Sequence, residues 1–112
     1  MVVAESGCVV VWTTIGSGTD AQTLASILVT ERLAACVNVL AEMESTYRWK
    51  GGVECERERQ MVIKTTAALV PDLEARLRAL HPYELPEFIV LPVAGGSEKY
   101  LAWIRESAAK SG

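Results

Sequence analysis

The hydrophobic pattern of the chain begins with a strand that is almost entirely apolar. Residues 8–15 read CVVVWTTI and are rich in β-branched side chains, which is typical of a strand covered on both faces. From residue 36 the period changes to two, and apolar and polar side chains alternate as far as residue 49. The alternation predicts a long strand with one buried face, which would consist of Val37, Val39, Ala41, Met43, Tyr47 and Trp49.

The stretch that follows predicts that this long strand belongs to a hairpin. Two consecutive glycines reverse the chain in a loop over residues 50–52, and residues 53–65 form the return strand. This register places apolar side chains opposite apolar ones and a positive charge opposite a negative one. It pairs Trp49 with Val53, Tyr47 with Cys55, Val39 with Ile63 and Arg48 with Glu54. It also sets Glu44 against Glu58, a repulsive pair that a two-residue turn or a bulge would remove. Either solution remains open at this level.

Two segments have the spacing of amphipathic helices packed on a sheet. Thr19 followed by Gln22 matches a capping box and would open a helix that runs to about Ala35. Its apolar face would consist of Ala21, Leu24, Ala25, Leu28 and Ala35. A second helix begins near Pro71 and ends before Pro82, because a proline there forbids its continuation.

The last quarter of the chain predicts an edge strand and a short helix. Residues 87–93 read EFIVLPV, and Pro92 favours an edge position or a strand end because proline cannot donate to a ladder. Ser97 can cap a terminal amphipathic helix that contains Trp103.

The order strand, helix, strand, strand, helix, strand, helix predicts an α+β fold in a single domain over residues 1–112. Two right-handed crossovers and one hairpin give a four-stranded antiparallel sheet with two helices on one face. This is the ferredoxin-like βαββαβ sandwich, here with an extra C-terminal helix.

The length of the alternating strand predicts self-association. Fourteen residues at roughly 3.3 Å each span about 46 Å, whereas a compact chain of this size has a diameter of about 35 Å. The hairpin tip would therefore overhang, and its aromatic face would need cover from another subunit. The alternative is a bent or bulged hairpin that folds back over its own domain.

Composition narrows the classes of partner. Acidic residues outnumber basic ones by 14 to 11, which disfavours a protein that tracks a nucleic-acid backbone. The apolar runs are shorter than the roughly 20 residues of a membrane-spanning helix, and the N-terminus lacks the pattern of a secretory signal. Three widely spaced cysteines, Cys8, Cys36 and Cys55, fit reduced thiols rather than a disulfide framework. We expect a cytoplasmic protein without a nucleic-acid or membrane partner.

The segment HPYELPE, residues 81–87, holds the single histidine of the chain. Pro82 pushes His81 towards extended geometry, so the imidazole stands at a junction rather than inside a helix. His81 could bind a divalent metal ion with oxygen ligands from Glu84 and Glu87. The other interpretation is that His81 ends a helix and satisfies backbone carbonyls.

Several segments together resemble the CutA divalent-cation tolerance proteins, and they cover roughly residues 8–107. They are RLAACVNVL, STYRWKGGVE, QMVIKTT, HPYELPE and YLAWI, in this order. The resemblance implies a ferredoxin-like subunit in a homotrimer whose long hairpins reach across to neighbouring subunits. It also implies a link to metal tolerance and copper binding, without an accepted enzymatic reaction or an organic cofactor. In architecture the family is similar to the PII signalling proteins.

The family's pattern lands on residues of the hairpin, the HPYELPE segment and the last helix. The matched positions are Cys36, Asn38, Tyr47, Trp49, Gly51, Glu58, Lys64, Thr65, His81, Pro82, Tyr83, Glu84, Pro86 and Trp103. Two departures put a pre-built copper site in doubt, because Thr13 and Leu80 stand where some members have a cysteine and a second histidine. The family often has lysine at Gly52, which predicts a looser hairpin tip here.

The matched residues allow a binding role or a purely structural one. Tyr47, Trp49, Tyr83 and Trp103 could line a cleft between subunits, or simply pack an interface. Lys64 could hold an anion or neutralise Glu58. Cys36 fits a small buried residue better than a reactive thiol.

Two functions of different classes follow. The first is a trimeric protein that binds copper or another divalent cation through His81 and Glu84 and acts in metal-ion tolerance. The second is a PII-like signalling or scaffold module that takes a small anion or a partner protein in inter-subunit clefts, an analogy of fold alone. No catalytic constellation is present in the sequence pattern, so we do not expect an enzyme.

Overall fold

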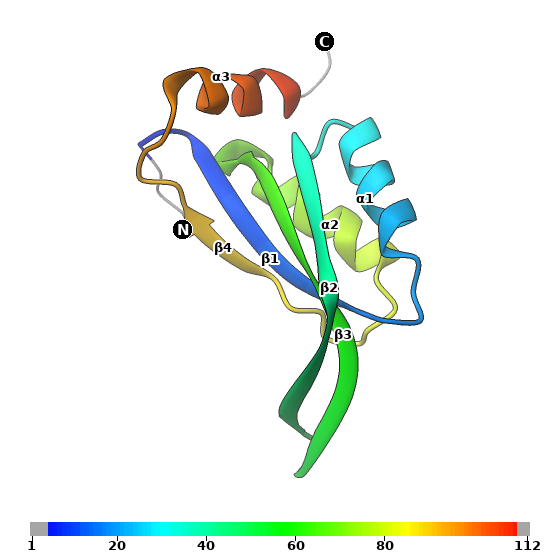
Figure 1. The fold of residues 1–112 in the computed structure, drawn as a ribbon. Helices are drawn as coiled ribbons and strands as arrows, with labels where there is room; N and C mark the ends of the chain where they lie inside the picture. Colours follow the sequence, from blue (N-terminus) through cyan, green and yellow to red (C-terminus); the bar gives the residue numbers. More distant parts are fainter. Residues whose placement is uncertain (1–4, 110–112) are drawn as a thin grey trace.

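A four-stranded antiparallel sheet forms the centre of the fold (Figure 1). The computed structural model describes residues 5–109. Its elements in chain order are β1 (Cys8–Gly16), α1 (Ala21–Thr30), β2 (Cys36–Trp49), β3 (Gly52–Thr66), a 3₁₀ turn η1 (Ala67–Leu69), α2 (Val70–Leu80), β4 (Ile89–Pro92) and α3 (Glu98–Ser107). The strand order β2-β3-β1-β4 confirms the predicted α+β class and the antiparallel sheet.

The helices α1 and α2 cover one face of the sheet (Figure 1). Leu28 of α1 and Leu73 of α2 are fully buried against Val11 of β1 and Ile63 of β3. The third helix, α3, packs at one end of the sheet, where Ile104 joins a second apolar cluster with Cys8, Ala35, Leu69 and Ala108. The opposite face of the sheet keeps much of its apolar surface exposed.

The first helix is shorter than its sequence pattern predicts. It ends at Thr30, and Arg32 has a positive φ of 62°, so the predicted continuation to Ala35 is wrong. The N-cap is Asp20, whose carboxylate accepts a hydrogen bond from the Thr23 N–H. The predicted capping box starting at Thr19 is therefore also wrong, by one residue. Because the chain leaves the helix at Arg32, Ala35 packs with α3 instead of on the α1 face.

The later elements follow the prediction. The second helix ends at Leu80, and His81 takes extended geometry with ψ 133° ahead of Pro82. The strand β4 pairs only with β1, which confirms the edge position, although it is shorter than predicted. Ser97 caps α3 by accepting from the Tyr100 N–H at 3.3 Å.

The hairpin register differs from the one that cross-strand matching favours. Trp49 pairs with Gly52 across a two-residue turn, in which Lys50 and Gly51 have φ values of 48° and 82°. This is the left-handed geometry that short hairpin turns need. Glu44 consequently faces Arg57 rather than Glu58. The turn that removes the glutamate clash is the one the chain adopts.

A β-bulge between Val39 and Glu42 reverses the faces of β2. Before the bulge, Val37 and Val39 pack against the α1 side of the sheet. After it, four odd-numbered residues, Met43, Ser45, Tyr47 and Trp49, line a cleft with Glu58 and Tyr83 instead. The single apolar face predicted for the whole strand is therefore wrong, because one extra residue shifts every later side chain to the other face.

The distal half of the hairpin extends beyond the sheet as a two-stranded ribbon (Figure 1). The β1 pairings of β3 reach only from Thr66 to Glu58, so residues 52–57 of β3 pair with β2 alone. The longest dimension of the described chain is 44 Å. At the tip, the Lys50 ammonium lies 3.5 Å from the Glu84 carboxylate, so the ribbon also touches the loop that follows α2.

Candidate functional site

A cleft of about 760 Å³ lies between the hairpin and the loop that follows α2. It combines aromatic, apolar and carboxylate side chains. The hairpin contributes Met43, Ser45, Tyr47, Arg48, Trp49, Glu56, Glu58 and Gln60, the loop contributes residues 83–88, Ile89 comes from β4 and Thr14 comes from β1. The bulge in β2 makes this cleft possible, because it turns the aromatic residues of the ribbon towards the loop.

Tyr83 and Glu58 form the buried base of the cleft. The Tyr83 hydroxyl donates a hydrogen bond of 2.7 Å to Glu58 Oε2, and Glu58 is only 6% exposed. Gly16 makes room for the Tyr83 hydroxyl, since a Cβ at that position would lie 3.3 Å from it. Burial first, and then the hydrogen bond to the Glu58 carboxylate, raise the pKa of Tyr83 well above its usual range.

His81 supports the loop from beneath. Its Nε2 lies 2.6 Å from the Thr14 carbonyl, and its Nδ1 accepts a 3.1 Å hydrogen bond from the Tyr83 backbone N–H. A carbonyl can only accept and a backbone N–H can only donate. The ring is therefore the neutral tautomer that carries its proton on Nε2, and both nitrogens are engaged. His81 ends α2, as one of the two interpretations expected, and its ring holds a strand carbonyl.

Gln60 and Glu87 close the side of the cleft next to β1. The Gln60 amide donates to the Thr13 carbonyl and to Glu87 Oε2, each at 2.8 Å. The sequence pattern did not mark Gln60 as a site residue. Its position two residues after Glu58, on the same face of β3, was the available signal.

Tyr47 and Trp49 form the ribbon wall of the cleft. Burial, followed by a hydrogen bond to Glu56 and the charges of nearby glutamates, raises the pKa of Tyr47. The Lys50 ammonium lies 5.5 Å from the centre of the Trp49 ring, within the range of a cation–π contact. A cation of the chain itself thus already lies between an aromatic ring and the Glu84 carboxylate at the mouth of the cleft.

The predicted site residues fall into two groups. Tyr47, Trp49, Glu58 and Tyr83 meet in the cleft, with Glu84 at its rim. Trp103 instead belongs to α3, and Cys36 and Lys64 lie near that helix. The Lys64 ammonium contacts the Tyr100 hydroxyl at 3.4 Å, and the tilted rings of Tyr100 and Trp103 have their centres 5.4 Å apart. Cys36 faces Lys64 across β2 and β3. Lys64 is turned to Tyr100, so the interpretation that Lys64 neutralises Glu58 is wrong.

The predicted metal ligands do not converge within one chain. His81 is buried, whereas the Glu84 side chain is 73% exposed and is held by Lys50. Among residues 5–109, no three His, Cys, Asp or Glu side chains come together in a way that could hold a metal ion.

In the same part of the chain, no helix is long and apolar enough to cross a membrane.

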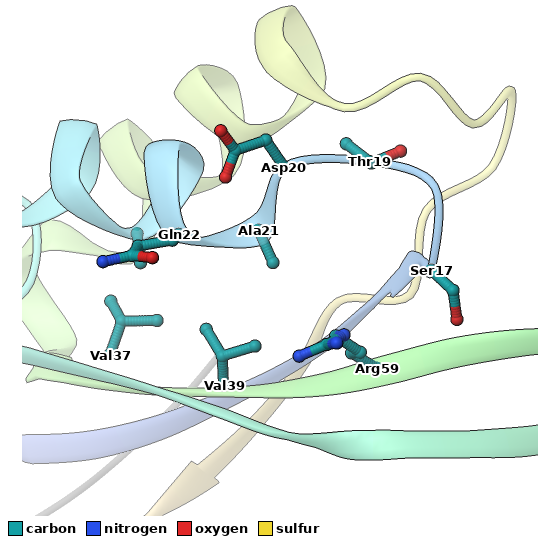
Figure 2. A pocket seen from close by; sticks show the side chains of 9 residues that line it. Ser17, Thr19, Asp20, Ala21, Gln22, Val37, Val39 and Arg59 are labelled. Atoms are coloured by element: carbon teal, nitrogen blue, oxygen red, sulfur yellow. The ribbon is translucent and has the colours of Figure 1, made fainter.

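A second pocket of about 480 Å³ lies between the start of α1 and the strands β2 and β3. Figure 2 shows Arg59 reaching from β3 towards Ala21 and Val39, with the Asp20 carboxylate turned away from it. Asp20 is occupied as the cap of α1. None of the predicted site residues lies in this pocket.

Comparison with known proteins identifies the family. A sequence model described as the CutA1 divalent ion tolerance protein matches residues 9–107. The chain belongs to the CutA1 family. That match covers every element of the sheet, the hairpin and the residues of the cleft, so the predicted resemblance is confirmed.

Relatives in the CutA1 family come from bacteria, plants and mammals. The divalent-cation tolerance protein CutA of Thermus thermophilus is 47% identical over 98 residues, which cover 88% of this chain and 95% of that protein. The chloroplastic CutA protein of Arabidopsis thaliana is 41% identical over 99 residues, which cover 88% of this chain. The chain spans 54% of the length of that plant protein.

Solved CutA1 structures share the whole fold. The Thermus thermophilus protein superposes with a TM-score of 0.88 at 45% identity, covering 91% of this chain and 99% of that one. CutA1 from Oryza sativa gives a TM-score of 0.88 at 38% identity, covering 93% and 95% of the two chains. The family is named for tolerance of divalent ions.

Proposed function

We propose that this chain is a non-enzymatic divalent-cation tolerance protein that acts in the cytoplasm as a homotrimer and binds copper or a similar ion. The observation that carries the proposal is the family match over residues 9–107. The 47% identity to a bacterial protein named for divalent-cation tolerance supports it. The whole of residues 1–112 would form one domain, and the strand order with two helices on one face supports a ferredoxin-like subunit.

The open face of the sheet supports assembly. Ile89 is 51% exposed and Leu91 48% exposed on β4, and Leu40 is 42% exposed on β2. On the same face, the Trp12 indole N–H is buried and has no acceptor within residues 5–109. Apolar surface and an unsatisfied donor together favour cover by another protein surface. The projecting ribbon supplies a means of reaching it.

Assembly also bears on the metal site. One chain offers no ligand cluster among its described residues, and a tight site for a transition metal needs three or four ligands in defined geometry. Binding through His81 and Glu84 would therefore require a rearrangement of the loop or ligands from a neighbouring subunit. His81 would have to give up its bond to Thr14 or to Tyr83.

Titration calorimetry of Cu²⁺ into the purified protein tests the metal proposal. We expect saturable binding that His81→Gln weakens strongly, with Glu74→Gln on α2 as a control that leaves it unchanged. Identical heats for the wild type and His81→Gln would remove His81 as a ligand. Light scattering tests the assembly, because a mass of only 12.2 kDa would contradict the trimer.

The PII-like alternative rests on weaker support. A small anion would need basic lining, and the cleft carries four glutamates against Arg48 and the nearby Lys50. Lys64 lies near α3, away from that cleft. Thermal shifts produced by nucleotides or small carboxylates, but not by metal ions, would favour this alternative.

A further inference from the structure

The last helix, α3, is attached to the rest of the chain through little buried surface (Figure 1). Of residues 98–107, all of which the structure describes, only Ile104 is buried, whereas α1 and α2 each bury two leucines in the main core. Ile104 packs in a separate small cluster with Cys8, Ala35, Leu69 and Ala108. An isolated helix shorter than about 12–15 residues is marginal in water, so the helical state of α3 depends on this docking.

The segment that connects β4 to α3 has the character of a hinge. Residues 94–97 read AGGS, are exposed and belong to no helix or strand. A Cβ at Gly95 would meet nothing within 4 Å, so side-chain packing does not hold the backbone there. Two adjacent glycines give the chain the freedom to change direction. The helix α3 can therefore move about this segment without disturbing the sheet.

Arginine side chains fasten the far end of α3 to the rest of the chain. The Arg32 guanidinium donates from Nε to the Ala109 carbonyl at 3.0 Å and from Nη2 to the Glu106 carbonyl at 2.7 Å. Arg105 donates to the Ser6 carbonyl at 2.8 Å. The last carbonyls of a helix lack partners within it, so Arg32 acts as a cap supplied from another element. All three hydrogen bonds are exposed to solvent.

A cysteine beneath α3 reports the position of the helix. Cys8 is fully buried, and its Sγ donates to the carbonyl of Leu101 in α3 at 3.6 Å. Its backbone lies in β1, where it pairs with Thr66 of β3. The thiol can therefore meet solvent by two routes, either when α3 moves away or when the sheet itself unfolds. The second route exposes far more surface than the first.

We propose that α3 is a lid, which opens about residues 94–97 while the sheet and the helices α1 and α2 stay folded, and that Arg32 fastens it in the closed state. Local opening is expected where few apolar side chains are buried and the hydrogen bonds are exposed to solvent. The helix α3 has both properties and a glycine hinge as well. Opening uncovers one end of the sheet, including the Cys8 thiol and Lys64, which meets Tyr100 in the closed lid. The inference does not depend on metal binding.

Labelling of the Cys8 thiol under native conditions tests the proposal. Cys36→Ser and Cys55→Ser together leave Cys8 as the single thiol of the chain. A chromogenic aromatic disulfide labels it at a series of low urea concentrations, and circular dichroism measures global unfolding of the same protein. We expect the labelling rate to indicate an open population at least about tenfold larger than the globally unfolded one. Its dependence on urea should be weaker, because opening of α3 exposes little surface.

Substitutions at Arg32 test how the lid is fastened. Arg32→Gln should raise the labelling rate about tenfold, because it removes two hydrogen bonds that exist only in the closed lid. Arg32 has a φ of 62°, so Arg32→Gly removes the same guanidinium while suiting the backbone, and it should raise the rate as well. Arg76→Gln is the control, since it removes an exposed ion pair with Glu31 at the same end of α1 but away from α3.

Labelling that follows global unfolding in both rate and urea dependence would overturn the lid. Equal acceleration in Arg32→Gln and Arg76→Gln, or acceleration in Arg32→Gln without any in Arg32→Gly, would overturn the role of the guanidinium. A rate that rises on dilution would also overturn the proposal, because separation of subunits would then release α3. Failure of Cu²⁺ binding would leave these results unchanged, so the lid and the tolerance proposal fail separately.

Discussion

The Tyr83 hydroxyl lies 2.7 Å from Glu58 Oε2 and joins the loop after α2 to the base of the projecting hairpin. His81 fixes the same loop from the other side, because its ring accepts from the Tyr83 N–H and contacts the Thr14 carbonyl. Both contacts reach the same end of the sheet, because Thr14 lies near the end of β1 and Glu58 is the β3 residue that pairs with Gly16, the last residue of β1. The loop wall of the cleft is therefore fixed to the sheet by hydrogen bonds at two places.

Replacing Tyr83 should make the protein less sensitive to alkaline pH. In the folded state the pKa of Tyr83 is raised above the ordinary value of 10.0, so folding favours the protonated phenol. The stabilisation is complete below about pH 10 and declines as the pH rises above it. Tyr83→Phe should lower the free energy of unfolding by about 2 kcal/mol at neutral pH, because buried Glu58 loses a donor. The stability of this variant should, however, fall less than that of the wild type between neutral and alkaline pH.

Denaturant unfolding at a series of pH values measures this effect, and ultraviolet absorbance of tyrosinate identifies the group. Tyr100→Phe is the control, since Tyr100 is exposed and meets Lys64 rather than a carboxylate. An alkaline decline of the same steepness in Tyr83→Phe and the wild type would contradict the assignment.

Gly16 should be required for the contact between Tyr83 and Glu58. A Cβ at Gly16 would lie 3.3 Å from the Tyr83 hydroxyl, so Gly16→Ala should push the hydroxyl away and cost about 1–2 kcal/mol. Gly18→Ala is a matched control, because its Cβ would meet nothing within 4 Å. In a Tyr83→Phe background the cost of Gly16→Ala should largely disappear, and a double-mutant cycle measures that coupling. An undiminished cost would show that the ring, and not the hydroxyl, is what Gly16 accommodates.

The sequence predicted the fold well because long-range packing and local pattern agree in most elements. The apolar run of β1, the edge proline of β4 and the proline boundary of α2 each have one dominant physical cause. The register of β2 and β3, in contrast, has no single dominant cause. Cross-strand matching is worth only about 0.2–1 kcal/mol per pair, and it did not outweigh a favourable two-residue turn and a bulge.

The candidate site was harder to predict because it depends on that bulge. Tyr47 and Trp49 lie in the cleft, yet the face on which they lie, and hence their neighbours Glu58 and Tyr83, follows only from the extra residue between Val39 and Glu42. The roles of the His81 nitrogens likewise depend on Thr14, which lies 67 residues away in the sequence. No local pattern encodes a contact of that range.

Thr13 should tolerate loss of its hydroxyl, whereas Thr65 should not. Both threonines are fully buried. The Thr13 hydroxyl makes no hydrogen bond within residues 5–109, while the Thr65 hydroxyl donates to the Leu33 carbonyl at 2.7 Å. Thr13→Val should therefore stabilise the fold by about 1 kcal/mol, and Thr65→Val should destabilise it by about 1–3 kcal/mol. Urea unfolding of the two variants measures the difference, and equal losses would refute the assignment of the Thr13 hydroxyl as unsatisfied.

The turn geometry predicts opposite responses at two adjacent glycines. Gly51 has a φ of 82°, where a Cβ is strained by about 1–2 kcal/mol. At Gly52 a Cβ would make only ordinary contact, at 3.8 Å from the Trp49 carbonyl. Gly51→Ala should lower stability by about that amount, and Gly52→Ala should be close to neutral or slightly stabilising. Because the three-residue loop would place both glycines inside the turn, a larger loss at Gly52 than at Gly51 would favour that register. Thermal unfolding of the two variants at equal protein concentration decides between them.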